Sequence, residues 1–418
     1  MAPGSTSPEP VAWIASLDSM PEEIKLHIAK TLSRRTKKPS VERYYADEVQ
    51  NYESSELNHL GHVNRGWRKI CKSLLSQHLA LKYSSVDAIA AGCASDGVKT
   101  LSIELDAPPL EAVAAISHVL KACPNIDTLS LALHRKGPYT VPEQRIATTI
   151  GNWLDGRRRR LKYLRIFYSN DDLLTLILSG QVFVPTLALA SQPNSYRVRS
   201  TYERQLFSQQ ACQALAHVHG VKIFTTDSGI PIEYLSWYKL TRDWPLETLV
   251  LSPADECVTR SEDLIPLIQL HANTLTSLRI EDEIDHGELR TKASTLKRSI
   301  ELPHLTKLEL VKSVPSKAFN PIWLPNNGPY TTFLDLLHPA TPIELLRFHI
   351  NVDSIASLCA FVKEQELERL RRIELCVRFK AKWYMGDPPE DEQWMALRSL
   401  CREKEIELAD QECIEYTR

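Results

Sequence analysis

The sequence has little glycine, few aromatic residues and no long apolar run. Only 14 of its 418 residues are glycine and 7% are aromatic. So little glycine argues against an all-β sandwich with many tight turns and favours helices joined by short loops. No stretch reaches the roughly 18 consecutive apolar residues of a membrane-spanning helix, and the first residues lack the basic start and apolar centre of a secretory signal. We therefore expect a soluble protein of the cytoplasm, the nucleus or both.

Cysteine and net charge exclude further classes. The nine cysteines are odd in number and no two stand in a CxxC spacing, which argues against a disulfide framework or a structural zinc site. We expect buried, reduced thiols that act as small apolar residues. The formal net charge of −2 leaves no overall field that would attract nucleic acid or an anionic membrane, so we expect neither as a partner.

Motifs that carry catalysis are also missing. The chain has no GxGxxG, Walker-type, HExxH or GxSxG motif, so we expect neither an enzyme nor a cofactor. His217 and His219 alternate and could share one face of a strand, but no carboxylate or cysteine stands at a suitable spacing, so no metal site is expected. The run Arg157–Arg160 is interpreted as a solvated loop, with a nuclear-import or acidic-partner patch as the alternative.

A short phrase with apolar residues at its first, fourth and sixth positions recurs roughly every 29 residues. This alternation places the fourth and sixth side chains on one face of a short strand, with the first at the strand's entry. Clear copies start at Val98, Ile126, Leu161, Leu246, Leu275, Leu305, Ile343 and Leu370, looser ones at Val184 and Val221, and a truncated last copy at Glu403.

Segments with helical periodicity separate these phrases. Apolar residues recur on one side of residues 110–120, 264–270 and 355–362. One strand and one helix cannot bury both of their apolar faces alone, but stacked units share one continuous core. The pattern predicts an α/β solenoid with a parallel, concave sheet on one side and helices outside.

These residues resemble the leucine-rich repeat in its longer intracellular form. The resemblance implies the solenoid fold for residues 81–418, in about ten irregular repeats. The Asn or Cys that the family places after the strand is seldom present, so we expect divergent turns. The alternative is an ordinary doubly wound α/β domain. Such a domain would show a glycine-rich phosphate-binding turn or acidic residues at strand ends, and the sequence has neither.

Residues 17–80 follow a different pattern, which predicts two amphipathic helices. Ser19 and Glu22 have the spacing of a capping box at a helix start, after which Ile24, Ile28 and Leu32 form an apolar stripe. A second stripe, at spacings of three and four, consists of Leu57, Leu60, Val63, Trp67, Ile70 and Leu74. Helices this short need a partner to pack against.

The same residues resemble the F-box, in a divergent form of the kind common in fungi. Its opening LPxEI-type helix is similar to Met20–Ile24, and its closing helix is similar to Leu60–Ile70. An F-box followed by leucine-rich repeats is a known family architecture. In that family the F-box binds the adaptor subunit of an SCF-type cullin–RING ubiquitin ligase, and the repeats hold the protein to be ubiquitylated. The resemblance implies an adaptor-binding apolar surface formed by Pro21, Ile24, Ile28, Leu60, Val63 and Trp67.

A charged insertion, residues 33–56, separates the two predicted helices where the F-box family usually has a short link. We expect the insertion to be solvated, which leaves the helices free to meet, and we expect residues 1–16 to be disordered. The alternative is that the two helices only cap the exposed end of the repeats. The protein would then be an interaction scaffold without a ligase role.

The face of the sheet opposite the helices is the remaining candidate for binding. Side chains at positions 3, 5 and 7 of each phrase point away from the core, and several are of the types that anchor protein interfaces. The predicted partner-binding residues are Tyr163, Arg165, Phe167, Arg279, Glu281, Lys307, Glu309, Leu345, Arg347, His349, Arg372 and Glu374. The hypothesis is a substrate-recognition subunit that binds the ligase adaptor through the F-box and an unidentified target protein through this face.

Overall fold

The computed structural model describes residues 20–35, 59–75, 77–82, 96–105, 108, 110–133, 140–155, 161–168, 171–191, 213–226, 241–251, 261–281, 300–311, 337–350, 359, 362–363, 367–378 and 392–413. The chain forms two compact units, Met1–Ala132 and Leu133–Arg418. Residues 1–16, the run Arg157–Arg160 and most of the insertion 33–56 lie outside the described residues.

The first unit begins with a helix pair and continues into a sheet. Its helices are α2 (Glu22–Arg35), α4 (Arg65–Leu75) and α6 (Glu111–Ala122), and its strands, in sheet order, are β1 (His78–Lys82), β2 (Thr100–Leu105) and β3 (Thr128–Leu133). In β1, Leu79 and Leu81 are aligned with Leu101 and Ile103 of β2, so the sheet starts one strand before the first predicted phrase. The segment of β1 does not match the apolar phrase, because its first position is the polar Ser76.

The second unit contains a longer series of parallel strands. Its strands, each hydrogen-bonded to the next, are β4 (Tyr163–Tyr168), β6 (Thr186–Ser191), β8 (Ile223–Thr226), β9 (Thr248–Leu251), β10 (Ser277–Glu281), β11 (Lys307–Val311), β12 (Leu345–Ile350), β13 (Arg372–Arg378) and β14 (Glu407–Cys413). Every neighbouring pair is parallel. This confirms the expected α/β architecture with a long parallel sheet and one strand per phrase.

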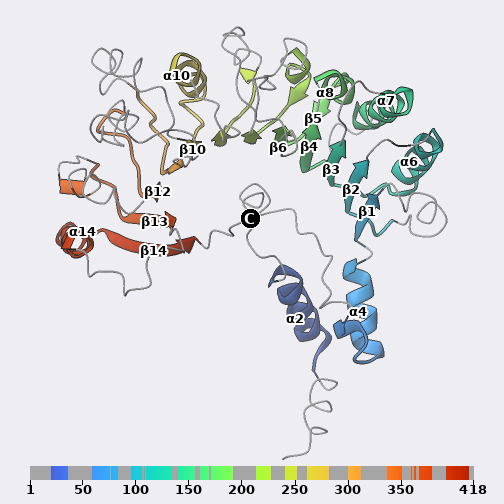
Figure 1. Cartoon of the computed structure of the whole chain (residues 1–418), viewed down its shortest axis with the longest axis horizontal. Helices are drawn as coiled ribbons and strands as arrows, with labels where there is room; N and C mark the ends of the chain where they lie inside the picture. Colours follow the sequence, from blue (N-terminus) through green and yellow to red (C-terminus); the bar gives the residue numbers. More distant parts are fainter. Residues whose placement is uncertain are drawn as a thin grey trace, which may run out of the picture. The chain divides into compact units, whose positions relative to one another are not determined.

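Helices cover one side of this sheet. They are α7 (Val141–Asp155), α8 (Asp171–Ile177), α10 (Ser261–Leu270) and α14 (Glu392–Glu403), and a separate two-stranded sheet consists of β5 (Val182–Phe183) and β7 (Val218–His219). Figure 1 shows α7, α8 and α10 on the same side of the strand series. None of the helices among the described residues covers the opposite side of the second unit's sheet, which is therefore called the helix-free face.

The fourth position of each phrase forms the centre of the core. These residues are aligned with one another across the sheet and are at most 1% exposed: Leu164, Leu187, Phe224, Leu249, Leu278, Leu308, Leu346 and Ile373. The looser copies that start at Val184 and Val221 thus have the predicted alignment. The last copy does not, because Ile373 is aligned with Leu408, so that phrase starts two residues later than predicted. A shift of two residues keeps every side chain on its predicted face.

A repeated hydrogen-bond pattern fixes the register between phrases. The carbonyl oxygen at position 2 of one phrase accepts the N–H groups at positions 2 and 3 of the next. The carbonyl of Lys222, for example, accepts from Glu247 at 2.7 Å and from Thr248 at 2.9 Å. The same double acceptance occurs at Pro185, Glu247, Thr276, Thr306 and Glu344. Residues inserted between phrases leave these bonds intact, which explains why the repeats tolerate irregular spacing.

A buried polar cluster holds the turn before β9 against the end of α10. Thr241 Oγ1 and His271 Nε2 are 3.0 Å apart, and the indole N–H of Trp244 donates to the carbonyl of Val218 at 2.7 Å. His271 is only 3% exposed. Burial lowers the pKa of His271 to about 4, although a hydrogen bond with the backbone of Trp244 acts in the opposite direction. The folded chain therefore contains a neutral imidazole at neutral pH.

Acid should weaken the fold through His271. Because its pKa in the folded chain is about 4, below the ordinary 6.5, the unfolded chain binds more protons in this range. The stabilisation is complete above pH 6.5 and is lost as the pH falls through about 4. The glutamine of a His271→Gln variant cannot titrate. The free energy of unfolding, measured with urea, should therefore fall less between pH 7 and pH 5 for this variant than for the original protein. Equal losses in the two proteins would contradict this role of His271.

Candidate protein-interaction surfaces

The helix pair α2–α4 has a small core of its own. Ala29 of α2 packs with Trp67, Cys71 and Leu74 of α4, and all four are at most 4% exposed. Around them lie partly buried apolar residues, Leu26, Ile28, Leu60 and Ile70. Burial raises the pKa of the Cys71 thiol, so it stays protonated and acts as a small apolar residue, as the sequence predicts for the cysteines.

Asn64 fixes the start of α4. Its side-chain oxygen accepts the backbone N–H of Trp67 at 2.9 Å, which is the bond that an N-cap residue makes to the third residue of a helix. The Asn64 carbonyl then accepts the N–H of Arg68 at 3.0 Å, as the first turn of the helix requires. The cap sets the direction of α4 immediately after the turn that contains Val63.

The residues predicted to bind the adaptor lie in three environments. Ile24 and Val63 are 48% and 45% exposed, and Pro21 is exposed as well. Ile28 and Leu60 are partly buried against the core of the helix pair. The exposed apolar part of the predicted surface is therefore smaller than the six residues suggested.

Trp67 requires a correction, because the structure buries it completely. Trp67 and Leu74 are seven residues apart, so both lie on the side of α4 that faces α2. The tryptophan therefore stabilises the helix pair from inside and is not part of its free surface. The amphipathic stripe predicted α4 itself, but not the turn at residues 62–64 that separates Leu60 and Val63 from it. Nor does such a stripe separate residues that pack on a partner helix from residues that bind a partner protein.

The helix-free face carries two rows of side chains that the sheet register aligns. Row 3, from phrase position 3, consists of Tyr163, Thr186, Ile223, Thr248, Ser277, Lys307, Leu345, Arg372 and Glu407. Row 5, from position 5, consists of Arg165, Ala188, Thr225, Val250, Arg279, Glu309, Arg347, Glu374 and Ala409. The structure thus aligns most of the predicted partner-binding residues.

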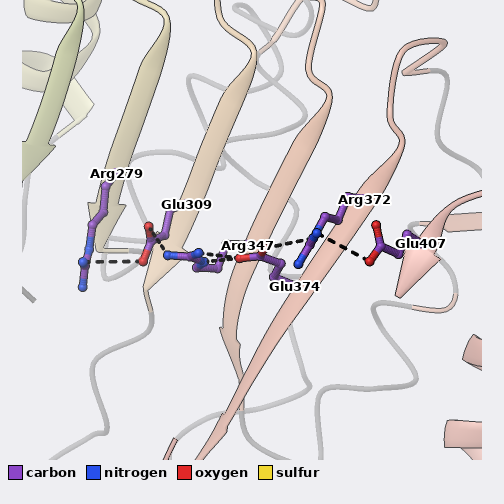
Figure 2. Close-up of polar contacts among 6 residues, drawn as sticks. All are labelled: Arg279, Glu309, Arg347, Arg372, Glu374 and Glu407. Carbon is purple, nitrogen blue, oxygen red and sulfur yellow. Dashed lines mark hydrogen bonds and ion pairs between the residues drawn. The ribbon is translucent and has the colours of Figure 1, made fainter. Parts of the chain in front are cut away.

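Six of these residues form a continuous charged ladder from β10 to β14 (Figure 2): Arg279, Glu309, Arg347, Arg372, Glu374 and Glu407. Arg347 is its centre, since its Nε donates to Glu374 Oε2 at 2.6 Å and its Nη1 donates to Glu309 Oε2 at 3.4 Å. Arg279 Nη1 lies 3.5 Å from Glu309 Oε1. Arg372 lies 3.0 Å from Glu374 and 3.5 Å from Glu407.

The two central carboxylates of the charged ladder are buried. Glu309 is 4% exposed and Glu374 is 5% exposed, which corrects the expectation that both present free surface. Each lies between two arginines, Glu309 between Arg279 and Arg347 and Glu374 between Arg347 and Arg372. The guanidinium groups cover the carboxylates and satisfy them. Because the ladder's three positive and three negative charges cancel, it presents no net charge to a partner.

On β4, at the other end of the helix-free face, the arginine contacts an aromatic ring instead of a carboxylate. The guanidinium of Arg165 lies 4.0 Å from the centre of the Phe167 ring, a cation–π contact. Both residues are half-buried. Tyr163 is 8% exposed, so the expectation of a solvent-facing tyrosine is also corrected. The alternation predicts which way a strand side chain points, but not what covers it.

The remaining predicted face residues lie where the alternation places them. Lys307 and Leu345 are half-buried in row 3, and the side chain of Arg372 is 42% exposed. Glu281 ends β10 and His349 lies in β12, while their side chains lie outside the described part of the structure.

Two features of this face were not predicted from the sequence. The predicted face residues end on β13, so Glu407 on β14 was left out, although its carboxylate terminates the charged ladder. The uncharged residues in the middle of rows 3 and 5, such as Thr225 and Val250, were also passed over. Their chemistry is too ordinary to draw attention until the register places them side by side.

The described residues show no assembled metal site. Among them, no group of three or more His, Cys, Asp or Glu side chains is placed to hold a metal ion. His217 and His219 are instead joined through one amide, with Gln181 Nε2 3.2 Å from His217 Nδ1 and Gln181 Oε1 2.5 Å from His219 Nε2. No helix among the described residues combines the length and apolarity needed to cross a lipid bilayer.

No protein-family model matches the chain, and no curated protein matches it. Several solved structures resemble it weakly, and three of them are described here. The leucine-rich repeat-containing protein LegL7 from Legionella pneumophila is 15% identical with a TM-score of 0.40, over 78% of this chain and 98% of that one. A chain of the Rad7 and Elc1 complex in yeast is 12% identical with a TM-score of 0.29, over 90% and 94%. The exo-β-1,4-mannosidase Op5Man5 from Opitutaceae bacterium strain TAV5 is 10% identical with a TM-score of 0.21, over 77% and 79%.

Similarities this low decide nothing about function. The repeat character of the chain rests on its own strand series, in which the fourth residue of each clear phrase of the second unit is aligned and buried. The chain is therefore a parallel α/β protein of the solenoid type. Its candidate functional surfaces are the exposed apolar residues of the helix pair and the helix-free face.

Removing Arg347 should destabilise the second unit. Arg347→Leu takes away the guanidinium shared by Glu309 and Glu374 and leaves each buried carboxylate with one arginine. Urea unfolding should show a loss of about 3 kcal/mol in the free energy of unfolding, which is typical of a broken buried ion pair. Lys307→Leu removes a cation from the same face outside the charged ladder and should change stability by less than about 0.5 kcal/mol. Equal effects of the two substitutions would show that the ladder does not stabilise the sheet.

Proposed function

We propose that this protein is a substrate-recognition subunit of an SCF-type cullin–RING ubiquitin ligase. Its helix pair binds the adaptor subunit, and its helix-free face binds the target protein. The observation that carries the proposal is a helix pair with its own buried core that still leaves Ile24 and Val63 about half exposed. This is how the F-box-like sequence of residues 17–80 would be expected to present an apolar surface.

Ile24 and Val63 belong to the same end of the helix pair. Ile24 is in the first turn of α2, and Val63 lies in the turn immediately before α4. The beginnings of the two helices are close, because a methyl carbon on Gly66 would lie 3.9 Å from Nζ of Lys25. Two exposed apolar side chains at one end of a small domain form a better docking point than isolated ones scattered over its surface.

The proposed role requires no catalysis by this chain. The protein holds a target near a separate ubiquitin-loading enzyme, which carries out the transfer. Such a role needs one surface for the ligase and another for the target, and the chain offers the helix pair and the helix-free face for these tasks. The site of action in this proposal is the cytoplasm or the nucleus.

Charged substitutions at the exposed apolar residues should abolish adaptor binding. Ile24→Asp and Val63→Asp each place a carboxylate in the proposed contact, where it would be desolvated without a partner. We expect at least a tenfold loss of affinity for the purified adaptor subunit, measured by isothermal titration calorimetry on the full-length protein. Val141→Asp is the matched control, since Val141 is 58% exposed at the start of α7, and it should bind like the original protein.

Absence of adaptor binding by the unmodified protein would overturn the proposal. It would favour an interaction scaffold whose helices only cap the repeats. Trp67 is unsuitable for this test, because Trp67→Ala would leave a cavity in the core of the helix pair, a loss of about 3 to 5 kcal/mol for a buried tryptophan. Its binding defect would reflect unfolding of the pair rather than a lost contact.

A further inference from the structure

The middle of the helix-free face has no charged side chain in rows 3 and 5. Its six residues on β6, β8 and β9 are here called the uncharged strip: Thr186, Ala188, Ile223, Thr225, Thr248 and Val250. Five are half-buried and Ala188 is 4% exposed. In row 5 the strip is bounded by Arg165 on β4 and by Arg279 on β10.

We infer that the uncharged strip is the docking site for the target, and that the target binds it with the uncharged side of an amphipathic α-helix. This inference rests on the proposed use of the helix-free face for target binding. It assigns to the charged ladder a different task, which is to hold β10 to β14 together.

Complementarity in charge determines the chemistry of the partner's contact side. A charged group pressed onto Ala188, Thr225 and Val250 would lose its water and gain no opposite charge from these residues. Apolar and hydroxyl side chains meet the strip without that loss. A partner gains less electrostatic energy at the charged ladder, because the buried carboxylates there are already compensated by arginines of the same chain.

Backbone hydrogen bonding favours a helix over an extended segment. The three strands of the strip are each paired on both sides, β6 with β4 and β8, β8 with β6 and β9, and β9 with β8 and β10. They have no free edge to which a partner strand could add. An extended segment lying on this face would leave its own backbone groups unsatisfied against apolar side chains, whereas a helix satisfies them internally.

The width of the strip also suits a helix. From β4 to β10 the sheet advances by four strand spacings, which is about 19 Å. An α-helix with its side chains is about 10 to 12 Å across, so it fits between the Arg165 and Arg279 positions. The small side chains of Ala188, Thr225 and Thr186 allow its surface to approach the sheet closely.

A display experiment tests the inference without a known target. The probe is a library of 16-residue peptides that keeps a helical Ala/Glu/Lys framework and randomises the positions i, i+3, i+4 and i+7 of one side. Selection on the full-length protein should enrich uncharged residues, mainly apolar, at those positions. A chosen peptide should lose at least tenfold in affinity on Thr225→Glu and on Val250→Glu, measured by fluorescence polarisation.

Lys307→Glu is the matched control, because it introduces the same carboxylate on the same face two strands beyond β9. It should bind the selected peptide within about twofold of the original protein. Circular dichroism and thermal unfolding establish that each variant is folded, and two strip variants are used so that one misfolded protein does not decide the result. The inference is overturned if no peptide is enriched, if charged residues are enriched on the contact side, or if the strip variants bind like Lys307→Glu.

Adaptor binding by the same preparations separates this inference from the proposed function. If the strip variants and the original protein bind the adaptor equally but no peptide is enriched, the inference fails while the ligase role stands. If peptides with the expected pattern bind the strip but the adaptor does not bind the helix pair, the ligase role fails and the docking site remains.

Discussion

The structure depends on a backbone hydrogen bond that is repeated from phrase to phrase. A single carbonyl at position 2 accepts two N–H groups from the next phrase, as Lys222 does with Glu247 and Thr248. This pair of bonds sets the register of the parallel strands. Once the register is fixed, strand alternation decides which side chains enter the core and which line the helix-free face. Connections of different lengths can follow without disturbing either.

The same register gives the face its chemical organisation. It aligns arginines with glutamates from β10 to β14, so that their charges are compensated within the chain, and it aligns uncharged residues from β6 to β9. Stability and recognition are therefore assigned to different strands of one sheet in our account. In the helix pair, too, different residues carry these two roles: Trp67 is buried in its core, while Ile24 and Val63 are exposed.

The sequence predicted what depends on periodicity and failed where environment decides. The spacing of apolar residues predicted that the strands are parallel and that the side chains at position 4, such as Leu278 and Leu308, face the core. Periodicity could not predict the burial of Trp67, because a helix stripe looks the same whether it packs on a partner helix or binds a partner protein. It could not predict the burial of Glu309 and Glu374 either, since Arg279 and Arg347, which pair with them, come from neighbouring strands.

Hydrogen–deuterium exchange on the full-length protein, with and without the adaptor subunit of a cullin–RING ligase, can show whether the helix pair and the helix-free face bind different partners. The account predicts that the adaptor slows exchange in residues 20–28 and 59–66 and leaves exchange in β6, β8 and β9 unchanged. Slower exchange confined to those strands, or no change anywhere in the chain, would contradict it.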